Sequence, residues 1–323
     1  MGKTDKLLTS NEHKFGFKAG HATDLCIFTL KQIVEFYRAA GSNVYVCFLD
    51  ASKAFDRVNH WFLFEKLLKR DVPNILVRLL CVWYSNQEFC VKWSNCLSTY
   101  FKVTNGVRQG GIMSPILFNT FINDLSVNLL EEGVGCHLGT QCMNHLFYAD
   151  DSVLLAPSPS ALQKLIHICE QFALDNEMLY NPKKSTCMCF RSKEMKKLHV
   201  PTIFLDKKPL DFRNENVYLG IKIREDLRDD DDIERQRKCM YAKGNVLIRN
   251  FKKCTNKVKC DLFRAYCTAL YCAHILSSFK DRSSHALTCI QQCFYVMCLV
   301  NCIIKSSFYL LASDLTHHWN NVT

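Results

Sequence analysis

The chain has 323 residues, a formal net charge of +10 and a hydrophobic fraction of 48%. This hydrophobic content excludes a disordered protein, and the length allows one large core or two domains. The charge is uneven, because residues 183–260 hold 21 Lys or Arg against 11 Asp or Glu. A basic block of this kind is typical either of a surface for a phosphate backbone or of a solvated helical face without a ligand.

The spacing of apolar residues predicts helices and strands along most of the chain. The segments expected to be helical are 23–39, 61–68, 72–84, 114–130, 160–178, 233–251 and 258–279. The segments expected to be strands are 44–49, 89–93, 99–103, 146–149, 153–156 and 217–223. After the last strand the pattern becomes purely helical, so we expect a domain boundary near Leu227.

Several helix ends carry local signals. Ser114 with Pro115 predicts a helix start with a capping hydroxyl and a proline in the first turn. Ser160 with Gln163 predicts a capping box for the following helix. The acidic run 229–232 precedes a later helix, and the helix dipole favours negative charge at that end.

The cysteine pattern and the termini bear on cellular location. The chain has 19 cysteines but no paired C-x-x-C pattern of a structural zinc site. The first ten residues are polar, so no signal peptide is expected, and Lys6 breaks a myristoylation motif. We therefore expect an intracellular protein of the cytoplasm or nucleus, with reduced thiols.

The C-terminal stretch 286–304 is apolar but contains Gln291, Gln292 and Asn301. We therefore expect a buried or partner-facing helix there rather than a membrane span. Its cysteines follow helical spacing, which favours packed thiols over a zinc site that includes His317 and His318. The cysteines concerned are Cys289, Cys293, Cys298 and Cys302.

The segment Phe147-Tyr148-Ala149-Asp150-Asp151 points to chemistry. Its two adjacent carboxylates stand between two apolar runs, which predicts a strand, a tight acidic turn and a second strand. Two crowded negative charges are unfavourable unless a cation neutralises them, and Mg²⁺ prefers carboxylate oxygens. An Asp-rich exposed turn is the alternative interpretation.

A third carboxylate lies at the end of the predicted buried strand 44–49, at Asp50. Asp50, Asp150 and Asp151 are expected to converge from two neighbouring strands. Three carboxylates around a pair of metal ions is the arrangement for in-line nucleotidyl transfer.

Five stretches stand in the order of the palm motifs of reverse transcriptases. They are VYVCFLDASKAFDRVNH, NGVRQGGIMSPILFN, FYADD, NPKKS and VYLG. The chain most closely resembles the reverse transcriptase domain of LINE-type non-LTR retrotransposons, over roughly residues 14–279. The resemblance implies an α+β fold, a right-hand polymerase palm with partial fingers and an all-helical thumb. It places fingers and palm in 1–226, the thumb in 227–280 and a tail of unknown role in 281–323.

The resemblance also implies roles for single residues. Asp50, Asp150 and Asp151 match the ligands of two Mg²⁺ ions, for which Mn²⁺ is a substitute. Lys184 matches the lysine that protonates the leaving pyrophosphate, although a surface lysine is the simpler interpretation of the pattern alone. Phe55 matches the aromatic gate beneath the nucleotide sugar, where a flat ring leaves no room for a 2′-hydroxyl, and a core phenylalanine is its alternative.

Two further groups of residues match binding motifs of the family. Arg108, Gln109 and Gly110 match the loop that contacts the incoming nucleotide and the template, and glycine there permits close backbone approach or simply a turn. The segment Tyr218-Leu219-Gly220 matches the start of the hairpin that grips the primer end.

The function implied is an RNA-directed DNA polymerase acting on an RNA template, a DNA primer and dNTPs, with no membrane involved. Only about thirteen residues precede Lys14, so we expect a chain that is N-terminally truncated relative to the family, without its endonuclease domain. The first alternative is a catalytically inactive remnant that binds nucleic acid. The second is a maturase-like RNA-binding protein.

Overall fold

The computed structural model describes residues 11–18, 20–192 and 201–267. The chain divides into two compact units. The first runs to Gly220 and includes 224–226, and the second comprises 221–223 and the residues from Leu227 onward. The predicted tail 281–323 and the end of the helix predicted over 258–279 lie outside the described residues.

The first unit is built on a five-stranded sheet with the strand order β13-β10-β1-β9-β8. Its strands are β1 (Val44–Asp50), β8 (His145–Tyr148), β9 (Asp151–Ala156), β10 (Thr186–Phe190) and β13 (Asp211–Phe212). The central strand β1 runs antiparallel to both neighbours, and β10 pairs with β13 in parallel. The strand that ends at Asp50 is therefore the middle of a mixed, mainly antiparallel sheet.

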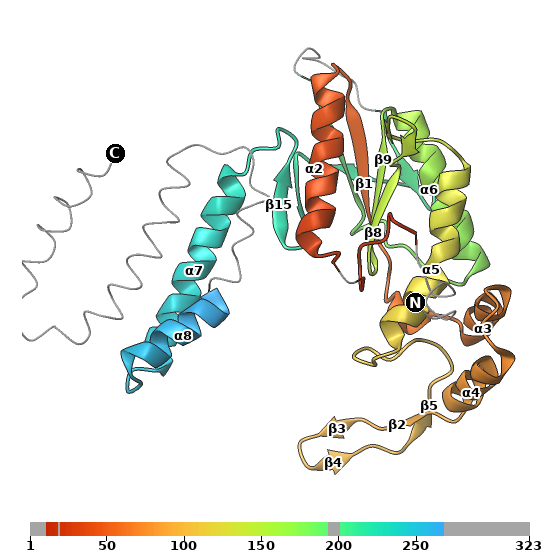
Figure 1. Ribbon diagram of the computed structural model, residues 1–323, viewed down its shortest axis with the longest axis vertical. Coiled ribbons are helices and arrows are strands. Elements are labelled where there is room, and N and C mark those ends of the chain that lie inside the picture. Colours follow the sequence, from red (N-terminus) through yellow and green to blue (C-terminus); the bar gives the residue numbers. More distant parts are fainter. Residues whose placement is uncertain (1–10, 19, 193–200, 268–323) are drawn as a thin grey trace, which may run out of the picture. The chain divides into compact units, whose positions relative to one another are not determined.

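Helices cover both faces of this sheet, which explains why β1 is apolar at every position before Asp50. Tyr45, Cys47 and Leu49 point into the core formed with α5 (Ser114–Glu131) and α6 (Pro159–Asp175). The alternate residues of β1 are equally buried on the other face, where α2 (Thr23–Ala39) contacts β1 and β8 (Figure 1).

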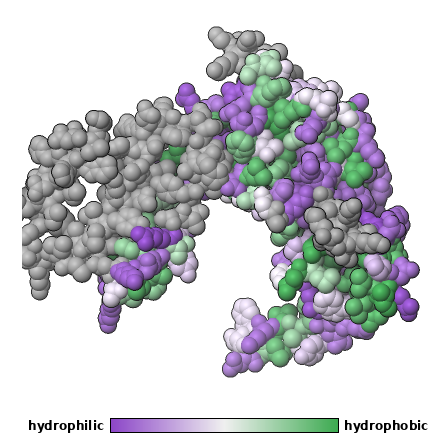
Figure 2. Space-filling model, in the orientation of Figure 1, coloured by the Kyte–Doolittle hydropathy of each residue, from purple (hydrophilic) through white to green (hydrophobic). Residues whose placement is uncertain are grey.

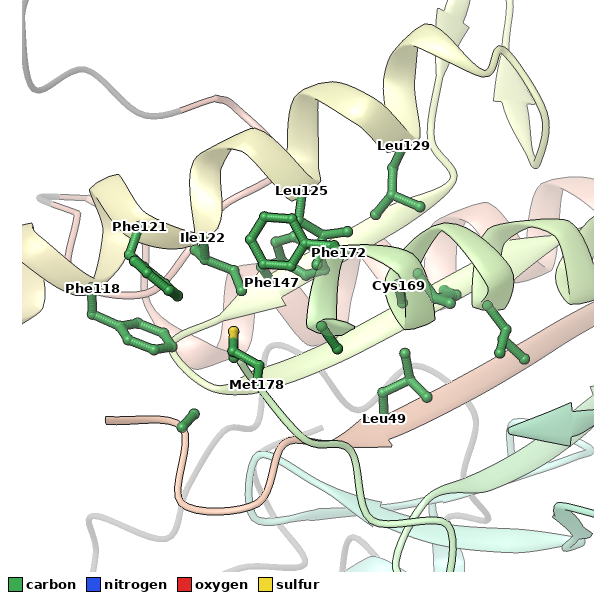
Figure 3. Close-up of a cluster of buried hydrophobic side chains, with 14 of the residues drawn as sticks. Leu49, Phe118, Phe121, Ile122, Leu125, Leu129, Phe147, Cys169, Phe172 and Met178 are labelled. Carbon is green, nitrogen blue, oxygen red and sulfur yellow. The ribbon is translucent and has the colours of Figure 1, made fainter. Parts of the chain in front are cut away.

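The main core lies between α5, α6 and the sheet. Figure 3 shows Phe121, Leu125 and Leu129 of α5 beside Phe172 and Cys169 of α6. The rings of Phe121 and Phe172 meet edge to face, with centroids 6.5 Å apart. This packing fixes the position of α5, and so of the loop that precedes it.

A short 3₁₀ helix, two α-helices and a long hairpin follow β1. They are η1 (Phe55–Arg57), α3 (His60–Lys69), α4 (Asn74–Ser85), β2 (Glu88–Phe89), β3 (Lys92–Trp93), β4 (Cys96–Leu97) and β5 (Phe101–Lys102). The predicted hairpin is present, since β2 pairs with β5, and it contains an inner pair, β3 with β4. Figure 2 shows a hydrophobic area over α4, where Ile75, Leu79 and Val82 are more than 60% exposed.

Shorter strands complete the first unit, and two helices form the second. The strands are β6 (His137–Leu138), β7 (Gln141–Cys142), β11 (Phe204–Leu205), β12 (Lys208–Pro209) and β14 (Glu215–Tyr218), while β15 (Ile221–Arg224) lies where the units divide. The helices α7 (Asp230–Asn250) and α8 (Asn256–Cys267) pack through Ile233, Met240 and Phe263. At the start of α7 the buried Asp232 accepts hydrogen bonds from Lys222 N–H and Gln236.

Two predicted helix starts are wrong in detail. Ser114 is already the first helical residue, and the cap before it, Met113, makes no side-chain hydrogen bond. The helix α6 is capped by Ser158, whose Oγ accepts the N–H of Ala161, rather than by Ser160. Pro159 suits the first turn of a helix, so the cap lies at Ser158, two residues before the predicted Ser160.

The strand predicted over 217–223 is also wrong. The chain turns at Leu219 and Gly220, which have φ values of +47° and +83°. Two consecutive residues in the left-handed region form the type of two-residue turn that joins antiparallel strands, and glycine adopts that conformation without steric cost. Because the residues on either side of the turn are apolar, the sequence pattern over 217–223 resembled a single strand.

In the part of the chain that the structure describes, no helix is long and apolar enough to cross a bilayer. All 14 cysteines described there are free thiols, and seven of them are buried. The buried thiols behave as small hydrophobic side chains of the core.

Candidate active site

The acidic segment forms the predicted hairpin turn. Tyr148 at the end of β8 pairs with Asp151 at the start of β9, so Ala149 and Asp150 make the turn between them. Ala149 has a φ of +56°, a left-handed conformation that alanine rarely adopts. Strained backbone of this kind is common at functional sites, where the surrounding structure enforces it.

The strand register brings two carboxylates together. Asp50, the last residue of β1, lies directly opposite Asp151, the first residue of β9. Partial burial, then the negative charges of Asp150 and Asp50, raise the pKa of the Asp151 carboxyl to about 6. Like charges on facing residues repel each other, so this pair favours a bound cation.

The loop before β10 wraps around the end of β1 and fixes Asp50. The Asn181 N–H donates to the Asp50 carbonyl at 2.9 Å, and the Asp50 N–H donates to Ser185 Oγ at 3.0 Å. The same loop places Lys184 Nζ 4.0 Å from Asp50 Oδ2. The Lys184 side chain is 69% exposed, so the ammonium group faces solvent beside the carboxylate.

Asp50, Asp151 and Lys184 line a pocket of about 130 Å³. Its lining brings four predicted site residues together, Asp50, Asp151, Lys184 and Tyr218. The remaining lining residues, to which the sequence analysis gave no role in the site, are Phe48, Leu49, Ser152, Asn216 and Val217.

Tyr218 is fixed at the wall of this pocket. Its hydroxyl lies 3.3 Å from the Cys26 thiol of α2, and its ring packs on Phe48 with centroids 5.4 Å apart. Leu219 and Gly220 form the turn that follows, and neither lines the pocket.

The predicted convergence of three carboxylates is found for two of them. Asp150 occupies the exposed turn and does not line the pocket. Among the described residues, no group of three or more His, Cys, Asp or Glu side chains is arranged to hold a metal ion. Asp150 lies outside the pocket because it belongs to the two-residue turn and not to the strands whose register pairs Asp50 with Asp151.

A second group of predicted residues gathers around η1. The Val107 N–H donates to the Phe55 carbonyl at 2.8 Å, which ties the loop before α5 to η1. The Phe55 ring stacks on Phe118 of α5 at 4.3 Å and 14°. Phe55 is half-buried, so one part of the ring packs into the core and the rest stays accessible.

The loop residues Arg108, Gln109 and Gly110 are exposed. The Arg108 guanidinium lies over the ring of Phe89 at 5.1 Å, and its Nε donates to the Gln87 side chain at 3.2 Å. Gln109 donates to Asp56 at 3.4 Å. Gly110 has a φ of +83° with open space around it, so the turn itself requires the glycine.

The donor set at the end of β1 fits a divalent cation. The register supplies two carboxylates that repel each other, and hard oxygen ligands of this kind suit Mg²⁺. Asp50 and Asp151 would hold the ion, and Asp150 on the adjacent turn is the next available carboxylate.

The mixed helix and sheet fold of the first unit is consistent with a polymerase fold, and sequence comparison gives the family. The profile of the family "Reverse transcriptase (RNA-dependent DNA polymerase)" matches residues 5–223. The chain therefore belongs to the reverse transcriptase family.

Curated relatives are proteins of non-LTR retrotransposons. The chain is 28% identical over 222 residues to the probable RNA-directed DNA polymerase from transposon X-element of Drosophila melanogaster, covering 65% of this chain and 23% of the relative. It is 28% identical over 213 residues to a Pol polyprotein of the retrotransposable element R2 of Nasonia vitripennis, covering 65% and 20%. It thus spans about a fifth of the length of these relatives.

A third relative is also named as an RNA-directed DNA polymerase, and one solved structure has a similar fold. The RNA-directed DNA polymerase from mobile element jockey of Drosophila funebris is 27% identical over 282 residues, which cover 79% of this chain and 29% of that protein. The telomerase of Candida tropicalis, solved with a fragment of telomeric RNA, superposes with a TM-score of 0.50 at 13% identity. That match covers 99% of this chain and 55% of the telomerase chain, and it indicates a shared fold.

Proposed function

We propose that this chain is the polymerising part of a non-LTR retrotransposon reverse transcriptase, which adds dNTPs to a DNA primer on an RNA template. The observation that carries the proposal is the pairing of Asp50 with Asp151 at the end of the central strands, with Lys184 4.0 Å from Asp50. Family membership supports the reaction class, and the relatives named as RNA-directed DNA polymerases support the template.

In this proposal the five-stranded sheet with α2, α5 and α6 is the palm. The helices α3 and α4 with their hairpin belong to the fingers. The helices from residue 227 form the thumb, whose excess of basic residues suits sequence-independent contact with a phosphate backbone.

The primer 3′-hydroxyl loses its proton to solvent water as its oxygen attacks the α-phosphorus of the dNTP, a new P–O bond forms, and the bond to pyrophosphate breaks. Mg²⁺, when bound, supplies Lewis-acid stabilisation of the attacking and leaving oxygens. Asp50 and Asp151 would hold the cation, and Lys184 would give a proton to the leaving pyrophosphate.

The loop residues Arg108 to Gly110 and the Phe55 ring are the proposed nucleotide site. Because Phe55 is stacked on Phe118, its ring cannot swing away from a 2′-hydroxyl placed against it. Tyr218 and the turn after it are the proposed primer grip, since Tyr218 lines the same acidic pocket and the turn follows it directly.

The test is primer extension by the purified chain on matched RNA and DNA templates. We expect extension on RNA, and we expect Asp151→Asn to abolish it while binding of the RNA–DNA hybrid is retained. Asp150→Asn run in parallel measures whether the turn carboxylate is a ligand. Hybrid binding without extension by the wild-type chain would instead support a nucleic-acid-binding remnant.

A further inference from the structure

Residues 13–17, which we name the strap, lie along the outer edge of β8. The Phe15 N–H donates to the Phe147 carbonyl at 2.7 Å, and the Phe147 N–H donates to the His13 carbonyl at 2.9 Å. Lys14 bridges to Phe147 in parallel orientation. The strap therefore adds backbone hydrogen bonds to the strand that leads into the acidic turn.

Asn119 of α5 also holds the strap, through both its side chain and its backbone carbonyl. The Asn119 side-chain amide donates to the Gly16 carbonyl at 3.0 Å. The buried Lys14 ammonium donates to the Asn119 carbonyl. A strap held by both β8 and α5 has little freedom to move by itself.

Gly16 lies directly against the acidic turn. A Cβ at Gly16 would stand 2.3 Å from Ala149 N and 3.1 Å from the Tyr148 carbonyl carbon. Both atoms belong to the backbone, so no side-chain rotation relieves the overlap. The close approach, rather than an unusual φ, is what requires glycine here.

Phe17 extends the strap to the other half of the site. Its ring meets the Phe55 ring edge to face, with centroids 6.2 Å apart and planes at 82°. Phe55 itself stacks on Phe118. Phe17 is 53% exposed, so its position is not explained by core packing.

We propose that the strap is a positioning element of the polymerase site, a proposal that rests on the function proposed above. Gly16 is the positioning residue for the turn that carries Asp150 and leads into Asp151. Phe17 is the positioning residue for the Phe55 ring. One segment, linked to α5 through Asn119, thereby couples the cation site and the sugar site.

The first test is Gly16→Ala, with Gly20→Ala as its control for backbone strain without steric overlap, because Gly20 has a φ of +76° and a Cβ there meets nothing within 4 Å. Mn²⁺ affinity, measured by electron paramagnetic resonance without nucleotide, reads the carboxylates independently of activity. We expect Gly16→Ala to weaken Mn²⁺ binding roughly 10- to 100-fold, the range for residues that orient metal ligands. We expect kcat for extension to fall while KM for dNTP stays within about twofold.

The second test is Phe17→Ala, with Phe36→Ala as a control of equal exposure on α2. We expect Phe17→Ala to lower the preference for dNTP over rNTP roughly 10-fold, which corresponds to about 1.4 kcal/mol of discrimination. We expect its thermal stability to stay near wild type. If Gly16→Ala fails to fold, this variant decides the proposal.

The outcomes separate the strap from the function on which it rests. If wild-type Mn²⁺ affinity and sugar preference persist in Gly16→Ala and Phe17→Ala, the strap proposal is wrong. If the wild-type chain does not extend primers, the polymerase proposal fails, while the Mn²⁺ measurement still decides whether Gly16 positions the carboxylates.

Discussion

Asp50 and Asp151 owe their proximity to the register in which β1 pairs with β9. A continuous apolar run produced β1, and a two-residue turn started β9 at Asp151. The sequence predicted the three carboxylates and their convergence, whereas the position of Asp150 outside the pocket depends on which residues form the turn. The same turn packs against Gly16, 133 positions before Ala149, a contact that no local pattern reveals.

The stacked Phe55 ring gives a prediction at this scale. Phe55→Val removes the flat surface but keeps an apolar side chain beside Phe118, so the site gains room for a 2′-hydroxyl. We expect the preference for dNTP over rNTP to fall by at least about 10-fold in single-nucleotide incorporation assays, with dNTP incorporation reduced less. Unchanged sugar preference would exclude Phe55 as the gate.

Lys14 gives a prediction for the pH dependence of stability. Burial lowers the pKa of Lys14 from 10.5 to about 7. The unfolded chain therefore binds more protons than the folded chain between about pH 7 and pH 10.5, and stability rises with pH across that window. The slope from this group is at most about 1.4 kcal/mol per pH unit.

Urea unfolding at several pH values checks this expectation. Lys14→Met should flatten the rise in unfolding free energy between pH 7 and 10, whereas Lys164→Met, an exposed site on α6, should leave it unchanged. If the unfolding free energy rose equally with pH in Lys14→Met and in wild type, the lowered pKa of Lys14 would be contradicted.

At the scale of elements, long periodic segments were predictable and their ends were not. The helix expected over 23–39 is α2 to the residue, because its apolar face repeats without interruption up to Gly41. The helix α6 begins at Pro159 because Ser158 and the proline act together, a combination that outweighed the Ser160–Gln163 pattern. Gln163 is used elsewhere, since its amide group bonds the backbone of Phe204.

The α6 cap provides the prediction at this scale. Ser158→Ala removes the hydroxyl that accepts the Ala161 N–H, and we expect it to lower the free energy of unfolding by about 1 kcal/mol. Ser160→Ala, two residues further on, should cost clearly less. Chemical denaturation of the two variants compares them directly, and a larger loss for Ser160→Ala would reverse the assignment of the cap.

At the scale of the whole molecule, the charge distribution and the sheet topology both agree with the proposed polymerase function. The excess of basic residues lies after the acidic turn in the chain, in 183–260, and the acidic pocket lies at the end of the central strands. Family resemblance was predictable because five motifs keep their order, and a matching profile over 5–223 confirms it. The aromatic contacts around Phe55 and the apolar surface of α4 were not predictable, since both depend on tertiary packing.

The most direct test of the account is the rate of single-dNTP addition to a DNA primer on RNA, for wild type and Asp151→Asn at saturating Mg²⁺. Loss of a cation ligand removes several kcal/mol of transition-state stabilisation, so we predict a decrease of at least about 10³-fold with hybrid affinity preserved. Addition by Asp151→Asn at the wild-type rate would contradict the assignment of the Asp50–Asp151 pair as the polymerase centre.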